Sequence, residues 1–339
     1  MTPELDLSSV SIRGADSIGR VRPDELPWGR IIEGGETMRL SINPFRMEAW
    51  FGNDILPVLD LIALADKKGI DAVDLPEHVV MGTRDLGAYP YAPNAEAREA
   101  MFTERTDFLE PIVLLTKIGA MTRRIRLSTG VLLAALRPAT LLAKQVATLD
   151  VLTNGRVELS FGVGWQKIEY DAQGLPWEGR FGRIFETARA CKLLWSQAPA
   201  SFAGTHINFE DIYCLPFPVQ PGGPPIMFGV GPSDLNVERL AQWADGWTPL
   251  GTPSDVVAAT LTRIKKRMSE IGRDPAAFRL RLNPDPIIKN GKLDVDATLA
   301  GIPALKKVGC TEVDLYVPAY CRGPEEFEPL MDKYLHYHD

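Results

Sequence analysis

The chain has 339 residues, of which 45% are hydrophobic and 24% charged, a balance typical of globular proteins rather than of collagen, coiled coils or disordered chains. Its formal net charge is -7, and no block of Lys and Arg could follow a phosphate backbone, so nucleic acid is not an expected partner. No apolar run approaches 18 residues, and the acidic start MTPELDLSS lacks the pattern of a signal peptide. These features predict a cytoplasmic protein that does not contact a membrane.

The sequence does not favour metal or serine-nucleophile chemistry. Its four cysteines, Cys191, Cys214, Cys310 and Cys321, are widely spaced, form no C-x-x-C pair and have no His at metal-ligand spacing. The motifs H-E-x-x-H and G-x-S-x-G are both absent. We therefore expect ordinary thiols and no metal site.

The first 37 residues are rich in Gly, Pro and charge and show no sustained periodicity, which predicts an N-terminal extension over residues 1–37. From Met38 onward, short apolar runs alternate with amphipathic stretches. This alternation is typical of a parallel sheet covered by helices. We therefore expect a single large α/β domain over residues 38–339.

In the first half of that domain, strands are predicted over residues 38–45, 72–76, 125–133 and 156–163. Helices are predicted over residues 54–69, 107–121, 138–152 and 181–195. Asn53 or Asp54 can cap the first of these helices, and Gly69 ends it. The long, charged and aromatic loop over residues 79–106 leaves the end of the second strand, which predicts a lid that sets substrate choice.

In the second half, residues 198–224 are rich in Pro and Gly and predict an inserted hairpin with its connection. Strands are predicted over residues 225–230, 246–250, 280–288 and 313–317, and helices over residues 234–244, 254–271 and 296–308. Eight strands is the number that closes a (β/α)8 TIM barrel, here with insertions. The rival fold, a doubly wound open sheet, would need a complete G-x-G-x-x-G fingerprint, which is absent.

In such a barrel the active site lies at the carboxyl ends of the strands. His78 is the only one of four histidines at a predicted strand end, and the neighbouring Glu77 could orient it or raise its pKa. A poised imidazole could give or take a proton in a redox step. A structural role for His78 in the barrel mouth remains equally open.

Glycines follow three further strands and would let a flat or phosphorylated ligand approach the backbone. One of these strands leads directly into a helix, whose positive dipole end favours a phosphate. Glycine at such a turn is also common for reasons of turn geometry alone. The strand-end residues that could contact such a ligand are Thr129, Gly130, Val131, Gly162, Val163, Gly164, Trp165, Gly229, Val230, Gly231, Pro232 and Ser233.

The segment over residues 137–165, RPATLLAKQVATLDVLTNGRVELSFGVGW, closely resembles the signature of the luciferase-like monooxygenase superfamily. Shorter matches are LPEH at 75–78, EY at 169–170 followed by GLP at 174–176, PVQ at 218–220 and ADGW at 244–247. The resemblance extends from about Met38 to the C-terminus and is closest to the branch that uses the deazaflavin coenzyme F420.

This resemblance implies a bacterial luciferase-like (β/α)8 barrel that binds F420 or FMN at its mouth. It implies that Glu77 and His78 lie near the cofactor ring and that a non-proline cis peptide at Gly130-Val131 supports the ring face. It also implies that the loops at 162–165 and 229–233 approach the ring and the phosphate-bearing tail. Some F420-dependent sugar-phosphate dehydrogenases carry an acid where this chain has Trp165, which argues against a sugar-phosphate substrate.

The expected activity is hydride transfer between F420 and a small organic substrate, with His78 handling the accompanying proton. A reduced-FMN monooxygenase that uses O2 is the alternative, and a non-catalytic flavin-binding protein or a phosphate-binding barrel isomerase remain open. No nicotinamide-binding domain is visible, so a separate reductase should supply the electrons. The resemblance also suggests a homodimer. Expected substrate contacts are Asn43, Tyr89, Tyr91, Met101, Phe102 and Trp247.

Overall fold

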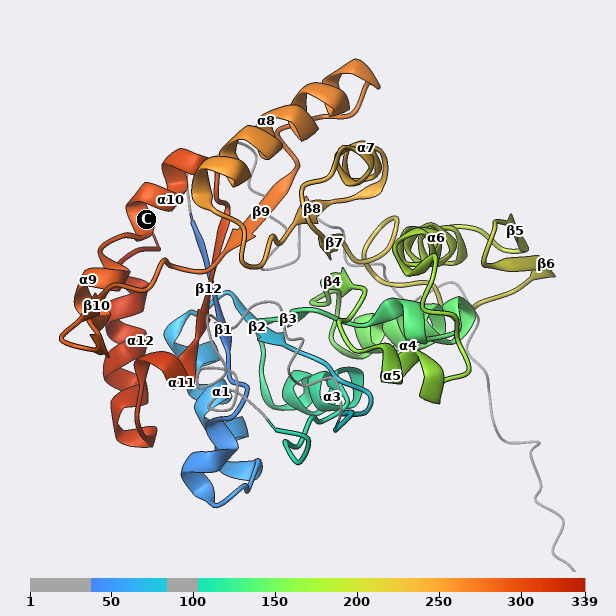
Figure 1. Ribbon diagram of the computed structural model, residues 1–339. Helices are drawn as coiled ribbons and strands as arrows, with labels where there is room; N and C mark the ends of the chain where they lie inside the picture. Colours follow the sequence, from blue (N-terminus) through green and yellow to red (C-terminus); the bar gives the residue numbers. More distant parts are fainter. Residues whose placement is uncertain (1–37, 84–102, 339) are drawn as a thin grey trace, which may run out of the picture. The chain divides into compact units, whose positions relative to one another are not determined.

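The computed structural model describes residues 38–83 and 103–338. Its main sheet has eight parallel strands in the order β3-β2-β1-β12-β9-β8-β7-β4 (Figure 1). Two further parallel bridges, Leu127 to Val157 and Leu132 to Phe161, join the outer strands β3 and β4. The sheet therefore closes on itself as the predicted (β/α)8 barrel. The predicted extension over residues 1–37 lies outside the described residues.

All eight predicted barrel strands are present, and all but the last are shorter than their apolar runs. They are β1 (Arg39–Asn43), β2 (Ala72–Leu75), β3 (Arg126–Thr129), β4 (Leu159–Gly162), β7 (Ile226–Gly229), β8 (Gly246–Trp247), β9 (Arg279–Leu282) and β12 (Glu312–Tyr316). The apolar runs are longer because their last residues continue into the loops at the carboxyl ends, where the functional residues were expected.

The helices that cover the sheet also follow the predicted order. They are α1 (Leu56–Lys68), α3 (Pro111–Met121), α4 (Ala139–Leu152), α6 (Arg180–Leu194), α7 (Asp234–Trp243) and α8 (Ser254–Glu270). Helix α1 begins after Asp54, whose carboxylate accepts from the Leu56 N–H, and ends at Gly69 with a positive φ of 105°. That left-handed conformation costs glycine little, which explains why the helix ends there.

Several elements differ from the prediction. The predicted helix over 296–308 is two helices, α9 (Val295–Leu299) and α10 (Ile302–Val308), because the Gly301-Ile302-Pro303 sequence starts a new helix with Pro in its first turn. The predicted strand over 280–288 ends early, and Ile288 instead belongs to a small hairpin of β10 (Ile288–Lys289) and β11 (Lys292–Leu293). The short α5 (Lys167–Ala172) lies in a stretch where no helix was predicted.

The C-terminal segment is also more ordered than a tail. A short α11 (Val317–Tyr320) leads to α12 (Phe327–Leu335), which packs against α1. Helix α12 buries Phe327, Met331 and Tyr334, and the Tyr334 hydroxyl donates to the Val313 carbonyl oxygen of β12. The 3-10 helices η2 (Met47–Phe51), η4 (Ala134–Leu136) and η5 (Pro324–Glu326) complete the described elements.

The predicted inserted hairpin is formed by the antiparallel strands β5 (Ala200–Ala203) and β6 (Asn208–Ile212). Glu186 of α6 holds its turn, because the carboxylate accepts from the backbone N–H groups of Thr205, His206 and Ile207 at 2.9, 2.8 and 3.2 Å. The bond network lowers the pKa of Glu186, although burial acts in the opposite direction. The hairpin is therefore fixed to α6 and projects away from the barrel strands (Figure 1).

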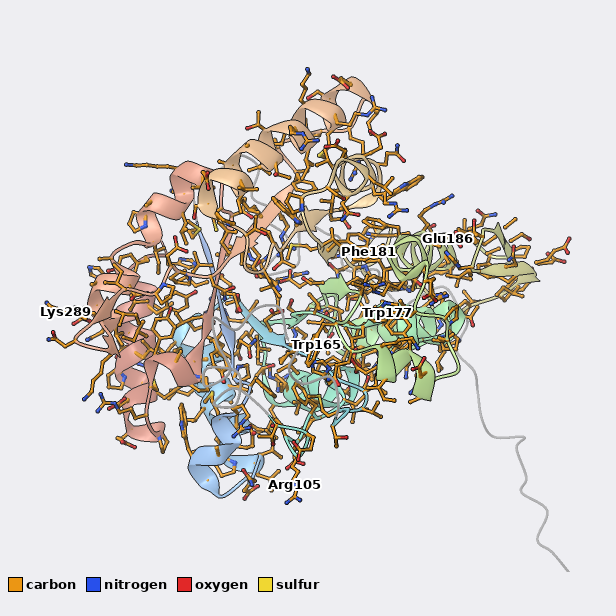
Figure 2. All side chains as sticks on the ribbon, viewed as in Figure 1. Arg105, Trp165, Trp177, Phe181, Glu186 and Lys289 are labelled. Atoms are coloured by element: carbon orange, nitrogen blue, oxygen red, sulfur yellow. The ribbon has the colours of Figure 1, made fainter. Side chains whose placement is uncertain are left out.

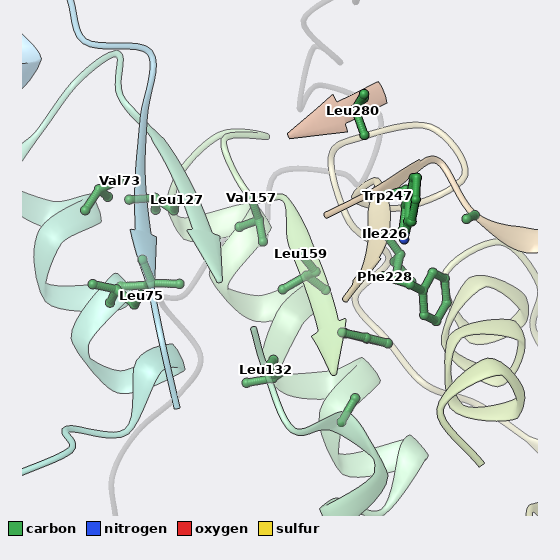
Figure 3. Close-up of a cluster of buried hydrophobic side chains, with 14 of the residues drawn as sticks. Val73, Leu75, Leu127, Leu132, Val157, Leu159, Ile226, Phe228, Trp247 and Leu280 are labelled. Atoms are coloured by element: carbon green, nitrogen blue, oxygen red, sulfur yellow. The ribbon is translucent and has the colours of Figure 1, made fainter. Parts of the chain in front are cut away.

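The apolar core lies between the strands and the helices rather than inside the barrel. Figure 3 shows side chains such as Val73, Leu127, Leu159 and Phe228, each from a different strand and each fully buried. Because side chains alternate along a strand, the intervening residues face the barrel interior, and these are largely polar. The four cysteines are buried free thiols, as expected. No helix of residues 38–83 and 103–338 is long and apolar enough to cross a membrane.

Candidate active site

His78 lies just beyond the end of β2, where it contacts two groups from the loop and helix that follow β4. Its Nδ1 is 3.1 Å from Glu169 Oε2, and the Trp165 indole Nε1–H donates to His78 Nε2 at 3.3 Å. Glu169 is fully buried on α5 and also accepts from the Val79 N–H at 2.9 Å. Trp165 lies inside the ring of helices and strands (Figure 2). The side chain of His78 is therefore held on both sides.

These contacts fit one protonation form of His78. The indole N–H can only donate, so His78 Nε2 must offer its lone pair. The imidazole proton is then on Nδ1, from where it donates to the Glu169 carboxylate. This neutral form has its acceptor nitrogen turned to Trp165 and a buried carboxylate behind it, ready to stabilise an imidazolium.

Glu77 has a different role from the one predicted. Its carboxylate pairs with the Arg137 guanidinium, with Arg137 Nη1 2.9 Å from Oε2, and it accepts from the Leu133 N–H at 2.7 Å. Burial raises the pKa of Glu77, while the Arg137 contact opposes that shift. Glu77 thus ties β2 to the segment after β3, and the carboxylate that orients His78 is Glu169 instead.

Aromatic rings extend from His78 across the mouth of the barrel. Phe108 lies edge-on to the His78 ring at 4.8 Å and stacks on Phe45 with centroids 4.6 Å apart. Trp165 packs edge-on to the other side of His78 at 5.6 Å. Arg46 reinforces the contact between the loop after β1 and residues 103–108, because its Nη1 donates to Thr106 Oγ1 at 3.1 Å.

The Gly130-Val131 peptide bond is cis, as the resemblance implied. A Cβ at Gly130 would collide with the carboxylate of Asp74, and a Cβ at Gly162 would collide with the Val131 side chain. At Gly229 a Cβ would lie 2.8 Å from Val131 Cγ1. The predicted glycines at 162 and 229 therefore make room for Val131, so their first role is packing rather than contact with a phosphate.

Val131 consequently covers two residues without side chains, and because it is only half-buried, part of its side chain remains as an apolar surface. Thr129, at the end of β3, is buried, and its hydroxyl is 3.0 Å from the Ser160 N–H of β4. It holds β3 to β4 beneath that surface. Gly164 has a positive φ of 69°, which redirects the chain so that Trp165 can reach His78.

The loop after β7 has the open glycine that a bound ligand would require. A Cβ at Gly231 would meet no atom within 4 Å, so nothing in the described protein requires glycine there. Asn236 Nδ2 donates to the Gly231 carbonyl oxygen at 3.0 Å, and Ser233 caps α7 by accepting from the Asn236 N–H. The loop, including Val230 and Pro232, is therefore fixed at the N-terminus of a ten-residue helix.

The predicted substrate residues are divided between three environments. Asn43 lies at the end of β1, half-buried, with its Oδ1 accepting from the Phe45 N–H at 3.0 Å. Trp247 is fully buried and donates to the Val230 carbonyl oxygen at 2.8 Å, so it faces the helix layer and supports the β7 loop instead of lining the mouth. Tyr89, Tyr91, Met101 and Phe102, with most of the predicted lid, lie outside the described residues.

A cavity of about 400 Å³ opens beside His78, between the loops after β1 and β2 and the helices α1 and α3. Its deeper walls are apolar, and its rim carries the polar side chains of Glu48, Asn53, Glu104, Thr106 and Asp107. Among residues 38–83 and 103–338, no group of three or more His, Cys, Asp or Glu side chains could hold a metal ion. The site therefore combines an imidazole, an apolar surface and a cavity.

Comparison with known proteins agrees with this arrangement. The family model for luciferase-like monooxygenase matches residues 44–308. The chain belongs to the luciferase-like monooxygenase family. An uncharacterised protein of Mycobacterium tuberculosis is 32% identical over 71% of this chain and 85% of its own length. The chain is accordingly a luciferase-like enzyme of the type that uses F420 or reduced flavin.

Solved structures share the barrel of this luciferase-like chain. The monooxygenase RslO1 from Streptomyces bottropensis superposes with a TM-score of 0.71 at 21% identity, covering 88% of this chain and 98% of its own. The coenzyme F420-dependent tetrahydromethanopterin reductase from Methanopyrus kandleri gives a TM-score of 0.66 at 14% identity, covering 90% and 100%. At these identities the likeness establishes the fold, and the cofactor has to be argued from the site.

Three site residues of the luciferase-like chain escaped the sequence prediction. Glu169 is one helix away from the strand ends that were inspected, and its only signal was the EY match at 169–170. Phe108 follows the long loop and carries no motif. Asp74 lies inside a buried strand, where a carboxylate in an otherwise apolar run signals an interior partner, here Arg281 at 2.7 Å.

Proposed function

We propose that this luciferase-like enzyme transfers a hydride between coenzyme F420 and a small organic substrate, with His78 handling the accompanying proton. The observation that carries the proposal is the side chain of His78, held by Glu169 and Trp165 at the edge of a cavity. FMN fits the same site. The F420 resemblance of the 137–165 segment favours the deazaflavin.

The residues that would hold the cofactor form two groups. Val131 offers an apolar surface to a ring, and the loops at 162–165 and 229–233 border it. The open backbone at Gly231, at the start of α7, suits a phosphate group because helix N-terminal N–H groups and the helix dipole both favour an anion. When bound, the cofactor supplies the hydride-accepting or hydride-donating ring carbon.

His78 can then accept or donate one proton at Nε2. In the oxidative direction, Trp165 releases Nε2, which takes the proton of the substrate hydroxyl while the substrate carbon loses its hydride. Glu169 stabilises the resulting imidazolium through Nδ1–H. In the reductive direction the same nitrogen donates the proton. Electrons would come from a cofactor reduced by a separate enzyme.

The experiment that tests this proposal is a pair of titrations of the full chain, one with F420 and one with FMN, followed by absorption and fluorescence. We expect F420 to bind at least tenfold more tightly than FMN. Tighter binding of FMN with O2 consumption on reduction would indicate the monooxygenase instead. Binding without turnover would indicate a flavin-binding protein, and binding of neither ring a barrel isomerase.

The Gly231→Asp substitution tests the phosphate position. It places a carboxylate in open space beside the expected anion, so cofactor affinity should fall at least tenfold while the free energy of unfolding changes by less than about 1 kcal/mol. Gly231→Ala is the matched control, because its methyl group meets no atom within 4 Å and adds no charge. Equal cofactor affinity in all three proteins would move the phosphate to another loop.

A further inference from the structure

We infer that the cavity beside His78 selects apolar organic molecules that carry a cationic amine and discriminates against carboxylates and phosphates. The inference deepens the proposed function by naming a substrate class, and it rests on that function in treating this cavity as the substrate side of the mouth. Its basis is the uneven distribution of charge and apolar surface within the cavity.

The deep end of the cavity is hydrocarbon. Five aliphatic residues from α1, β2 and α3 line it, namely Val58, Leu59, Ile62, Leu75 and Leu114. Val58, Leu59, Ile62 and Leu75 are at most 4% exposed. A buried pocket of this kind favours an aromatic or branched aliphatic group, at about 25 cal/mol per Å² of apolar surface removed from water.

The rim of the cavity is acidic. Glu48, Glu104 and Asp107 line it, and none of the described lining residues is Lys or Arg. Burial raises the pKa of Glu48, and the neighbouring Asp107 adds to that shift. A cation placed beside Glu48 and Asp107 would relieve the repulsion that Glu48 experiences.

Arg46 lies close to this rim without lining it. The Arg46 guanidinium donates to Thr106 Oγ1 and partly offsets the charge of Glu48. It leaves the excess of carboxylates on the rim in place. The rings of Phe45 and Phe108, which also line the cavity, stack on each other with centroids 4.6 Å apart and add apolar aromatic surface to its wall.

The rim therefore sets the charge preference and the rings add to the apolar surface. An amine gains attraction from the carboxylates, whereas a carboxylate or phosphate meets repulsion from them. Because Glu104 and Asp107 are exposed, each contributes modestly, and their joint effect is expected to reach about five- to tenfold in affinity.

The test uses three probes of similar shape: 2-phenylethylamine, 2-phenylethanol and phenylacetate. Their dissociation constants for the full chain are measured by ligand-observed NMR, with and without saturating cofactor. The amine should bind at least fivefold more tightly than phenylacetate, with the alcohol between them, and the preference should shrink as salt is raised. Phe108→Ala should weaken all three probes together, because each places its phenyl ring against Phe108.

The charge assignment is tested with the double variant Glu48→Gln/Asp107→Asn, in which the amine and phenylacetate should bind within about twofold of each other. The control is Glu210→Gln/Glu325→Gln, which removes two exposed carboxylates away from the cavity lining and should keep the full preference. Equal or tighter binding of phenylacetate to the unmodified chain overturns the inference. These dissociation constants are measured without turnover. The charge preference can therefore be determined even if the F420 titrations fail.

Discussion

The amino end of the barrel interior holds charged groups in a dense network of ion pairs, whereas the mouth holds a single imidazole with few partners. Toward the amino end, Arg281 is buried among carboxylates and hydroxyls, with Asp74 Oδ1 at 2.7 Å from Nη1, Glu312 Oε1 at 2.6 Å from Nε and Ser128 Oγ at 2.9 Å from Nη2. Glu158 accepts from Arg39, Arg126 and Arg279 as well. At the mouth, His78 has one buried carboxylate and one indole.

Burial alone would lower the pKa of Arg281, but its four acidic neighbours raise it overall. Burial likewise raises the pKa of Glu158, and the surrounding arginines more than reverse this, so both groups stay charged. Such a network tolerates no change of protonation without a large cost, because each charge depends on the others. The mouth instead holds the His78 imidazole, which can exchange a proton while Glu169 fixes the position of the ring. The buried ion pairs therefore stabilise the barrel, whereas the mouth contains the group that can take part in proton transfer.

The largest expected effect comes from His78→Ala. We expect kcat to fall by about 10²- to 10⁴-fold, the usual contribution of a general acid or base. The free energy of unfolding should fall by a smaller amount, about 1–3 kcal/mol, because the buried Glu169 loses His78 but keeps its bond from the Val79 N–H. Steady-state kinetics and urea denaturation measure the two quantities.

The control for that variant is His336→Ala, which removes an imidazole just after α12 and should keep full activity. A fall in kcat of less than about threefold in His78→Ala, with cofactor still bound, would assign His78 a structural role in the mouth.

At the other end of the barrel, Arg281→Met should lower the free energy of unfolding by about 3–5 kcal/mol, because it leaves Asp74, Glu158 and Glu312 buried without their shared cation. Urea denaturation gives the value. Arg263→Met is the matched control, since its partner Asp234 is exposed, and it should cost less than about 1 kcal/mol. Similar losses in the two variants would contradict a special role for the buried network.

The sequence was informative about the scaffold because hydrophobic periodicity reports which residues face the helix layer. All eight strands and six of the main helices could be located that way, and so could His78 at the end of β2. Periodicity says little about partners across the barrel. Glu77 and Glu169 are both acidic, and only the path of α5 decides which of them reaches His78.

The same limit explains the glycines and Trp247. Gly162 and Gly229 look alike as ligand contacts in sequence, yet both exist because Val131 approaches them from a loop that follows β3. Trp247 follows Gly246, which faces the interior, so strand alternation turns the tryptophan outward to Val230. Neither fact can be derived without the register of the closed barrel.

The smallest expected effect concerns Asp314, which lies between the two ends of the barrel. Its Oδ1 is 2.9 Å from the Ser41 hydroxyl, and the Asn283 amide donates to its main-chain carbonyl oxygen at 2.8 Å. Burial, followed by repulsion from Asp74, raises the pKa of Asp314 from 3.8 to about 7, with Glu312 adding repulsion and Arg281 opposing it. The folded protein therefore holds a proton there that the unfolded chain releases.

Since the folded state binds the extra proton between pH 3.8 and about 7, this group's contribution to stability is complete at low pH and is lost as pH rises through that window. Asp314→Asn replaces the protonated acid with a neutral amide of the same shape. It should therefore be more stable than the unmodified chain at pH 8, by about 1 kcal/mol or more, while the two unfold alike near pH 4. Urea denaturation at both pH values measures this, and a difference that is the same at pH 4 and pH 8 would show that Asp314 is ionised throughout.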